Sequence, residues 1–291
     1  MNLNGRREST NVDDRRRGGG KKIVGGGIGA IIIAVIVAYF TGGKEGAFQA
    51  LTEGVQQQIA QRGEVATEGR EFTAEEDSLA KFSKQILAST EDVWTKRFQE
   101  MGQEYECPKM VLYTGSVQTS CGNGSAAMGP FYCGGDQCVY IDLSFFQSMK
   151  KEIGATGEFS NAYVIAHEVG HHVQEQLGIL GRAHQRMAQL SKEEANKVSV
   201  MIELQADFFA GVWGYYENKT FHSVSDREIA EAIKCAQLIG DNYLQQQAQG
   251  YVVPESFTHG TSEQRMRWFK LGLTTGNINL GDTFSKNYED L

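Results

Sequence analysis

Proline is scarce in this sequence, with 3 among 291 residues, and cysteine is nearly as scarce, with 5. Few prolines leave long helices uninterrupted, because proline removes a backbone N–H donor and ends or kinks a helix. Few cysteines exclude a small scaffold held together mainly by disulfides. The hydrophobic fraction of 41 % is enough for a core and excludes disorder along the whole chain. We therefore expect an α+β fold that is rich in helices and has a small sheet.

Positive charge is also in short supply, with 28 Lys and Arg against 36 Asp and Glu. The shortage is uneven. Residues 1–40 carry seven basic and three acidic side chains, whereas residues 41–291 carry 21 basic and 33 acidic ones. Phosphate backbones repel so acidic a body, so we expect no nucleic-acid partner.

Residues 23–40 form an uncharged and strongly apolar run, IVGGGIGAIIIAVIVAYF, directly after Lys21 and Lys22. At 1.5 Å per residue, such a run is just long enough to cross about 30 Å of hydrocarbon. We expect a transmembrane helix over residues 23–41, with the lipid bilayer as its partner. A buried core helix and a cleaved signal peptide are the alternatives, but a signal peptide has a shorter apolar run that ends at small residues. The positive-inside rule predicts a single-pass membrane protein with a cytoplasmic N-terminus and its long body on the outer side of the membrane.

The rest of the chain divides by composition into three further parts. Residues 1–22 are predicted to be a basic cytoplasmic tail, residues 42–74 a linker, and residues 75–291 the folded domain. Apolar residues recur at helical spacing from 75 to 101, and VYIDLSFF at 139–146 has the composition of a strand. Between these, a glycine-rich stretch could be closed by a disulfide, either Cys121–Cys133 or Cys133–Cys138. The oligomeric state stays open.

The residues best suited to chemistry lie in AYVIAHEVGHHVQEQLG, at 162–178. His167 and His171 are four residues apart, so a helix would place both imidazoles on one face, where they can bind one metal ion. Glu168 follows His167 and can reach a water at the metal without being a ligand. A longer pattern, H-E-x-x-H-x-x-G-x-x-H, is excluded because Gln174 and Leu177 occupy its last two positions. Two helical histidines can also be packed in a core, so a third ligand is required.

A second predicted helix, EEANKVSVMIELQADFFAGVWGYY at 193–216, can supply that ligand. Glu203 and Asp207 share one face of it, in apolar surroundings with no Lys or Arg from 198 to 218. Unpaired carboxylates are costly there. We expect Glu203 to complete a His2Glu site for one Zn²⁺, while Asp207 accepts the free ring N–H of a ligating histidine. An exposed helix face, or pairing with a distant Arg, is the alternative.

Four ordered blocks carry a resemblance to a known family. They are HEVGHH at 167–172, ELQADFFAG at 203–211, GPFYC with VYIDLSFF within 129–146, and THGTSEQRMRWF at 258–269. With the basic N-terminal segment and the single apolar run, they resemble the bacterial putative neutral zinc metallopeptidase family. The resemblance implies a zincin-like fold of the gluzincin type, metal ligands His167, His171 and Glu203, and catalytic Glu168. It also implies a protein of the bacterial inner (plasma) membrane with a periplasmic or extracellular peptidase domain. A peptidase acts on a polypeptide substrate, but the resemblance supplies no particular one.

His259 stands apart in a Thr-His-Gly loop before a predicted helix that begins at Thr261 or Ser262, with Ser262 as a plausible N-cap. A histidine in such a loop can donate a hydrogen bond to the oxyanion of a peptide-hydrolysis intermediate. It could equally be a surface residue. Arg265 could pair with Asp207, bind a substrate carboxylate or form an unrelated salt bridge, and His172 is expected to be structural.

The sequence thus predicts a membrane-anchored zinc metallopeptidase in which Glu168 is the general base and His259 assists catalysis. We expect the substrate to lie as an extended strand along residues 139–146. Two alternatives remain: a catalytically idle zinc-binding membrane scaffold, and an interaction protein without metal. The peptidase prediction requires the Glu203 carboxylate to lie beside both imidazoles.

Overall fold

The computed structural model describes residues 1–16 and 71–291, apart from residues 153 and 156. The predicted transmembrane helix over residues 23–41 lies outside the described residues, as does most of the linker predicted for residues 42–74. Among the described helices, none combines the length and the apolar character that a membrane crossing requires.

A mixed four-stranded sheet has the strand order β1-β2-β6-β5. Its strands are β1 (Val12–Asp14), β2 (Lys109–Tyr113), β6 (Cys138–Asp142) and β5 (Phe131–Cys133). The first three are parallel, and β5 runs antiparallel to β6. A separate hairpin, β3 (Ser116–Thr119) and β4 (Gly122–Ser125), precedes β5, and a Cys121–Cys133 disulfide ties its turn to β5. One of the two predicted disulfides is thus formed.

The strand predicted over residues 139–146 is only partly right. It ends at Asp142, because the Asp142 carboxylate accepts the backbone N–H of Ser144 at 3.0 Å and a helix begins there. This strand, β6, pairs with β2 on one side and β5 on the other, so it has no free edge. In the part of the chain that the structure describes, the edge at this end of the sheet belongs to β5, so the expected pairing of a substrate strand along residues 139–146 is wrong.

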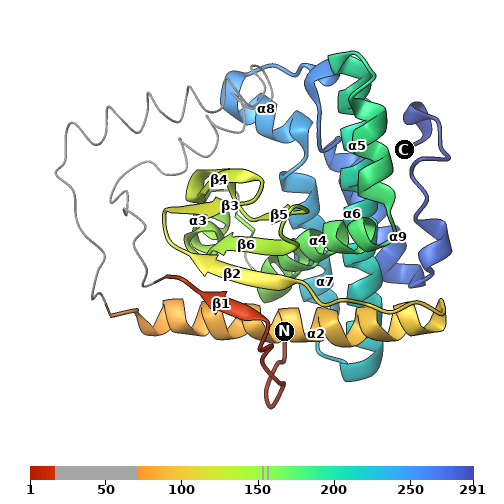
Figure 1. The fold of residues 1–291 in the computed structure, drawn as a ribbon. Helices are drawn as coiled ribbons and strands as arrows, with labels where there is room; N and C mark the ends of the chain where they lie inside the picture. The colour runs from red at the N-terminus through yellow and green to blue at the C-terminus, as the bar shows by residue number, and fades with distance from the viewer. Residues whose placement is uncertain (17–70, 153, 156) are drawn as a thin grey trace, which may run out of the picture.

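Helices make up most of the described chain, which confirms the predicted helix-rich α+β fold with a small sheet. Figure 1 shows α2 running along the bottom of the view beside β1, with α4, α6, α7 and α9 gathered to the right of the sheet. The helices are α2 (Ala74–Glu100), α3 (Ser144–Glu152), α4 (Glu158–Gln176), α5 (Ile179–Met187), α6 (Lys192–Phe221), α7 (Asp226–Leu238), α8 (Asp241–Gln249) and α9 (Ser262–Thr275). Short 3₁₀ turns are η1 (Ala126–Met128), η2 (Pro254–Ser256), η3 (Ile278–Leu280) and η4 (Tyr288–Asp290).

Capping explains where several of these helices begin. Thr73 caps α2 in a reciprocal capping box with Glu76, so the helix predicted over residues 75–101 starts within one residue of expectation. Thr261, not Ser262, is the N-cap of α9, and its box partner is Gln264. These local signals fix helix ends that periodicity alone leaves open.

Close backbone approach sets the spacing of the central helices. A Cβ on Gly170 of α4 would lie 2.9 Å from the carbonyl oxygen of Ala206 in α6. Between α6 and α9, a Cβ on Gly211 would lie 2.2 Å from the Phe269 oxygen, and one on Gly272 would lie 2.1 Å from the Phe208 oxygen. Real Cβ contacts are never this short, so α4, α6 and α9 pack at distances that only glycine allows at these positions.

Residues 1–16 belong to the folded body. The composition of residues 1–22 predicts a basic cytoplasmic tail, but β1 pairs with β2 in register Val12–Met110 to Asp14–Leu112. Arg6 also reaches the buried Glu217 of α6. The segment has the basic composition of an unfolded tail, but its strand pairing and its ion pair with Glu217 make it part of the folded domain.

Candidate metal centre

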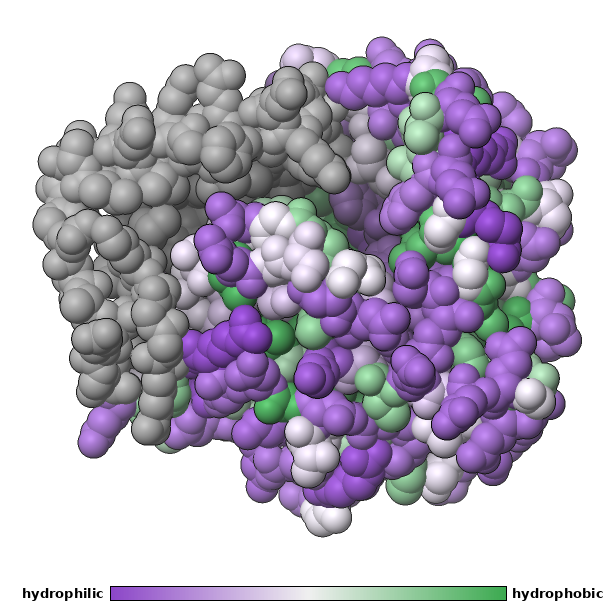
Figure 2. All heavy atoms as spheres, viewed as in Figure 1, coloured by the Kyte–Doolittle hydropathy of each residue, from purple (hydrophilic) through white to green (hydrophobic). Residues whose placement is uncertain are grey.

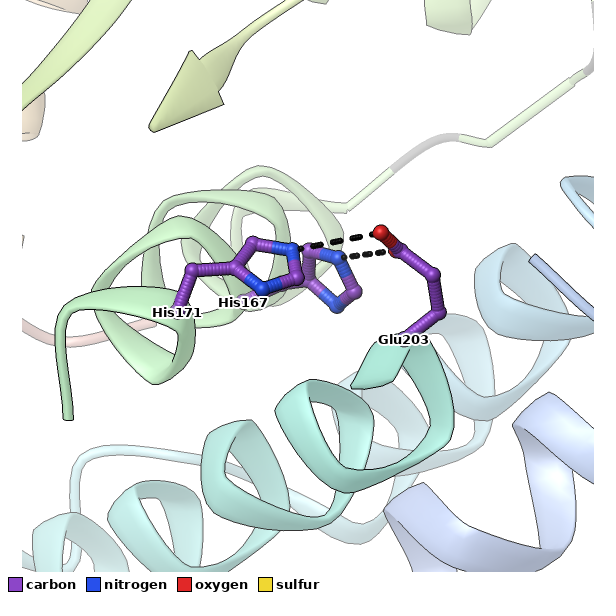
Figure 3. Close-up of side chains that lie close together, drawn as sticks. All are labelled: His167, His171 and Glu203. Carbon is purple, nitrogen blue, oxygen red and sulfur yellow. Dashed lines mark hydrogen bonds and ion pairs between the residues drawn. The ribbon is translucent and has the colours of Figure 1, made fainter. Parts of the chain in front are cut away.

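His167 and His171 project from α4 toward Glu203 on α6, as Figure 3 shows. The His167 Nε2 lies 3.1 Å from Glu203 Oε2, and the His171 Nε2 lies 3.5 Å from Glu203 Oε1. The two predicted helices therefore bring together the three predicted ligands, which come from positions up to 36 residues apart.

Both imidazoles have their other nitrogen already engaged. The Nδ1 of His167 lies 2.8 Å from Asp207 Oδ1, and the Nδ1 of His171 lies 2.9 Å from Gln174 Oε1. Gln174 is itself fixed, because its amide donates to the Ile202 carbonyl and to Gln205 Oε1. Each histidine is thus oriented by an outer partner, and both Nε2 atoms face the same point.

These three residues fit a zinc ion. One ligand atom from each lies within 4.8 Å of the others. Ligands bonded at about 2.1 Å in a tetrahedron lie roughly 3.4 Å apart, close to the two Nε2–Oε separations. Two imidazoles and a carboxylate are also the donor set typical of catalytic zinc with one coordination position left open.

Asp207 is fully buried and is the centre of a hydrogen-bond network. Besides His167, it accepts from the Tyr163 hydroxyl at 2.5 Å, and from Nε and Nη2 of Arg265 at 2.8 and 3.0 Å. Burial alone would raise the pKa of Asp207, but Arg265 and His167 lower it to about 2. The carboxylate is therefore charged, as required to hold the His167 Nδ1–H.

Charge at the site also shifts the pKa of two ligands. Burial alone would lower the pKa of His167, but the carboxylates of Asp207 and Glu203 raise it to about 10. Burial acts in the opposite sense on Glu203, whose pKa lies well below its usual range because of the histidines around it. A metal ion that binds His167 would therefore compete with a proton at this ring.

Glu168 follows His167 on α4 and is 8 % exposed. Its carboxylate has no hydrogen-bond partner among the described residues. A carboxylate without competing donors, one residue from a metal ligand, is free to interact with a water at the metal.

His259 lies in the loop between α8 and α9, and this loop packs against α6 at the level of Glu203. A Cβ on the adjacent Gly260 would lie 3.2 Å from Val200 and 3.3 Å from Leu204. His259 is half-buried, and its Nδ1 is 3.3 Å from Oδ1 of the fully buried Asp241. Burial alone would lower the pKa of His259, but the charge of Glu203 raises it. The structure therefore brings His259 to the edge of the ligand group.

Asp241 was not found from the sequence. Its Oδ2 accepts the backbone N–H groups of Thr258, His259 and Gly260 at 2.8, 2.7 and 3.1 Å. Its place as the first residue of α8, 18 residues before His259, carries no local motif. Tyr163 and Gln174 were missed in the same way, although Gln174 is three residues after His171 and could have been recognised as its neighbour on the helix face.

Arg265 pairs with Asp207, which was one of the three roles considered for it. His172 faces away from the ligand group: its Nε2 donates to the Glu106 carbonyl at 2.7 Å, and its Nδ1 accepts from the Tyr132 hydroxyl at 3.0 Å. Because Tyr132 lies on β5, this contact holds the sheet edge beside α4.

Figure 2 shows a recess in the surface between the β3–β4 hairpin and α5.

Comparison with known proteins agrees with this geometry. The model of a family described as putative neutral zinc metallopeptidase matches residues 1–284. The uncharacterized protein YpfJ of Escherichia coli K12 is 45 % identical over 293 residues, which is 99 % of this chain and all of that protein. The uncharacterized protein Rv2575 of Mycobacterium tuberculosis H37Rv is 43 % identical over 191 residues, covering 62 % of this chain and 64 % of that protein. No solved structure matches the chain.

Proposed function

The chain belongs to the putative neutral zinc metallopeptidase family, and from that premise we propose that it is a zinc-dependent peptidase that hydrolyses peptide bonds in polypeptides. The observation that carries the proposal is the convergence of His167, His171 and Glu203, with both Nδ1 atoms held from behind. When bound, a zinc ion in such a site supplies Lewis acidity, which makes water more acidic and polarises a carbonyl group.

Glu168 is the general base of this proposal. It takes a proton from the attacking water and passes it to the leaving amine. His259, held by Asp241, donates a hydrogen bond to the substrate carbonyl oxygen as negative charge develops there. Asp207 and Gln174 keep the two ligand imidazoles in place throughout.

The substrate is proposed to bind as an extended strand along β5. Among the described residues this strand pairs with β6 alone, so its other edge can accept a strand, and Tyr132 connects it to the helix that carries the histidines. The uncharged run at residues 23–40 supports attachment to a membrane, so polypeptides at the membrane surface are the proposed substrates.

The test uses the full chain and its Glu168→Gln variant, purified identically. Metal content is measured by elemental analysis, and turnover is measured on fluorescein-labelled casein with and without a chelator. We expect about one zinc per chain in both proteins, and hydrolysis only by the zinc-loaded wild type, with a loss of at least 100-fold in the variant.

Each part of the proposal has a result that contradicts it. Equal hydrolysis by both proteins would mean that the activity is a contaminant or uses another base. Zinc without hydrolysis would favour the idle scaffold, and a chain without zinc would favour an interaction protein. A His184→Ala variant is a matched control, because this histidine is exposed on α5 and belongs neither to the ligand group nor to the contacts that hold β5.

A further inference from the structure

The N-terminal segment, residues 1–16, completes the folded body. Its strand β1 forms one edge of the sheet, and backbone hydrogen bonds to β2 also involve the residues directly before and after β1. The Met110 N–H donates to the Asn11 carbonyl at 2.9 Å, and the Arg15 N–H donates to the Leu112 carbonyl at 2.8 Å. In Figure 1 the segment, coloured red, lies against β2 and α2.

A buried carboxylate on α6 depends on this segment for its counter-ion. Glu217 is fully buried, and Arg6 donates to both of its oxygens, at 2.7 and 3.1 Å. The hydroxyls of Ser89 and Ser223 also donate to it. Among the described residues, Arg6 is the only cation that pairs with Glu217 in an ion pair. Without Arg6 a charge would remain buried and uncompensated, which is strongly destabilising.

A second carboxylate repeats this dependence. Glu91 of α2 is 5 % exposed and accepts from Ser9 Oγ at 2.6 Å, from Asn11 Nδ2 at 2.8 Å and from Arg7 Nη2 at 2.9 Å. All three donors belong to the N-terminal segment. Residues 71–291 therefore contain two buried acids whose cationic partners, Arg6 and Arg7, come from the other side of the uncharged run.

The match to the family also starts within this segment, since it covers residues 1–284. Strand pairing and buried ion pairs act over about 3 Å, whereas the hydrocarbon of a bilayer is about 30 Å thick. A single crossing by residues 23–41 would separate the N-terminal segment from the body by that thickness. The contacts and a single crossing exclude each other in one folded chain.

We propose that residues 1–16 and 71–291 lie on the same side of the membrane, so that the uncharged run attaches the protein to the bilayer without dividing it between two compartments. This replaces the single-pass topology expected from the sequence. The positive-inside rule places charged flanks relative to a crossing, and it does not apply where the two flanks are joined in one sheet.

Cysteine accessibility in bacterial spheroplasts tests the proposal on the full-length chain. In a Cys107→Ser background, which removes the exposed free thiol, one variant carries Asn4→Cys and another carries Lys270→Cys. Both positions are exposed, one in the N-terminal segment and one on α9. A membrane-impermeant maleimide polymer is added before or after detergent, and labelling is measured as a gel shift.

Each pattern of labelling either supports or overturns the proposal that the two segments lie on one side of the membrane. If both positions react without detergent, or both react only with it, the two segments share a side. If one position reacts without detergent and the other only with it, the proposal is overturned. Thr10→Cys, also exposed, is a second reporter for the N-terminal segment should Asn4→Cys fail to accumulate. The readout is independent of zinc and of hydrolysis.

Thermal unfolding of the detergent-solubilised full chain tests the premise that the segment completes the body. Arg6→Ala should lower the unfolding midpoint by roughly 5–15 °C, because it leaves Glu217 unpaired. Arg15→Ala is the matched control: its ion pair with Asp13 is half exposed, so its midpoint should change by about 2 °C or less. Equal midpoints for the two variants would refute the premise.

Discussion

Replacing Asp207 by Asn changes one charge at the point where the fold and the metal centre meet. The carboxylate accepts from His167, Tyr163 and Arg265, and no part of it is exposed. Asn has the same shape and can keep one acceptor oxygen. Its amide N–H groups would then face the guanidinium of Arg265, a residue that is 4 % exposed and would be left without a counter-ion.

Two separate losses follow from this change. The unpaired Arg265 should cost about 3–5 kcal/mol of unfolding free energy, as removal of one partner from a buried pair does. The weakened hold on His167 should lower zinc affinity by about 10- to 100-fold, the usual effect of losing an outer partner of a ligand. Chemical denaturation of the metal-free protein measures the first, and competition with a chelator measures the second.

A double variant separates these two effects. Asp207→Asn with Arg265→Met removes both charges, so most of the stability should return, while zinc affinity should stay low because His167 still lacks its carboxylate. If the single variant bound zinc as tightly as the wild type, Asp207 would have no role in orienting His167. If the double variant recovered zinc affinity together with stability, the effect on affinity would be a consequence of unfolding.

The same carboxylate predicts an acid dependence with a defined sign. Its pKa falls from an ordinary 3.8 to about 2 in the fold. The stability it contributes is therefore complete above about pH 4 and is lost as the pH falls through 2. The shift corresponds to about 2 kcal/mol. In the metal-free protein, Asp207→Asn should remove this part of the acid dependence, as measured by denaturation between pH 2 and 5.

Three further predictions concern the surroundings of the ligands. Without metal the pKa of His167 is raised to about 10, so zinc must displace a proton from this ring. Apparent zinc affinity should therefore rise about tenfold per pH unit from 7 to 9, and calorimetry in two buffers should detect about one proton released per ion. A pH-independent affinity would contradict this. Gly170→Ala places a Cβ 2.9 Å from a carbonyl oxygen of α6, so it should lower the unfolding free energy by about 1–3 kcal/mol and weaken zinc binding. Gly181→Ala has open space around its Cβ and should do neither. Competition with a chelator compares the zinc affinities of the two variants. Asp241→Asn should lower kcat by roughly 10- to 100-fold with zinc content unchanged, because it loosens His259; a normal kcat would remove His259 from the proposed mechanism.

The parts of the site that could be predicted from the sequence are those encoded within one helix. A spacing of four residues places His167 over His171, and the same spacing relates Glu203 to Asp207, wherever the two helices lie. Their meeting was inferred only from the cost of burying acids without cations. The residues that allow it, Gly170 among them, act through contacts between helices and have no periodic pattern.

What could not be predicted shares one property: the partner is distant and the local signal is weak or misleading. Asp241 caps a loop 17 to 19 residues further along, and nothing in its own neighbourhood marks it. VYIDLSFF has the composition of an edge or central strand alike, because β propensity reflects burial and neighbours more than position in a sheet. Only the pairing order shows that β5 holds the free edge.

The N-terminal segment shows how one pattern of charge is compatible with two arrangements. The contrast between a basic first 40 residues and an acidic remainder is real, and it suggested two parts in two compartments. Strand β1 has the sequence Val-Asp-Asp, and aspartate is depleted in strands, so no local signal opposed that interpretation. The structure gives the contrast another meaning: Arg6 and Arg7 neutralise acids that the body buries. Two stretches of opposite charge can lie in different compartments, or they can lie in contact and neutralise each other. The burial of Glu217 and Glu91 favours contact between the N-terminal segment and the body.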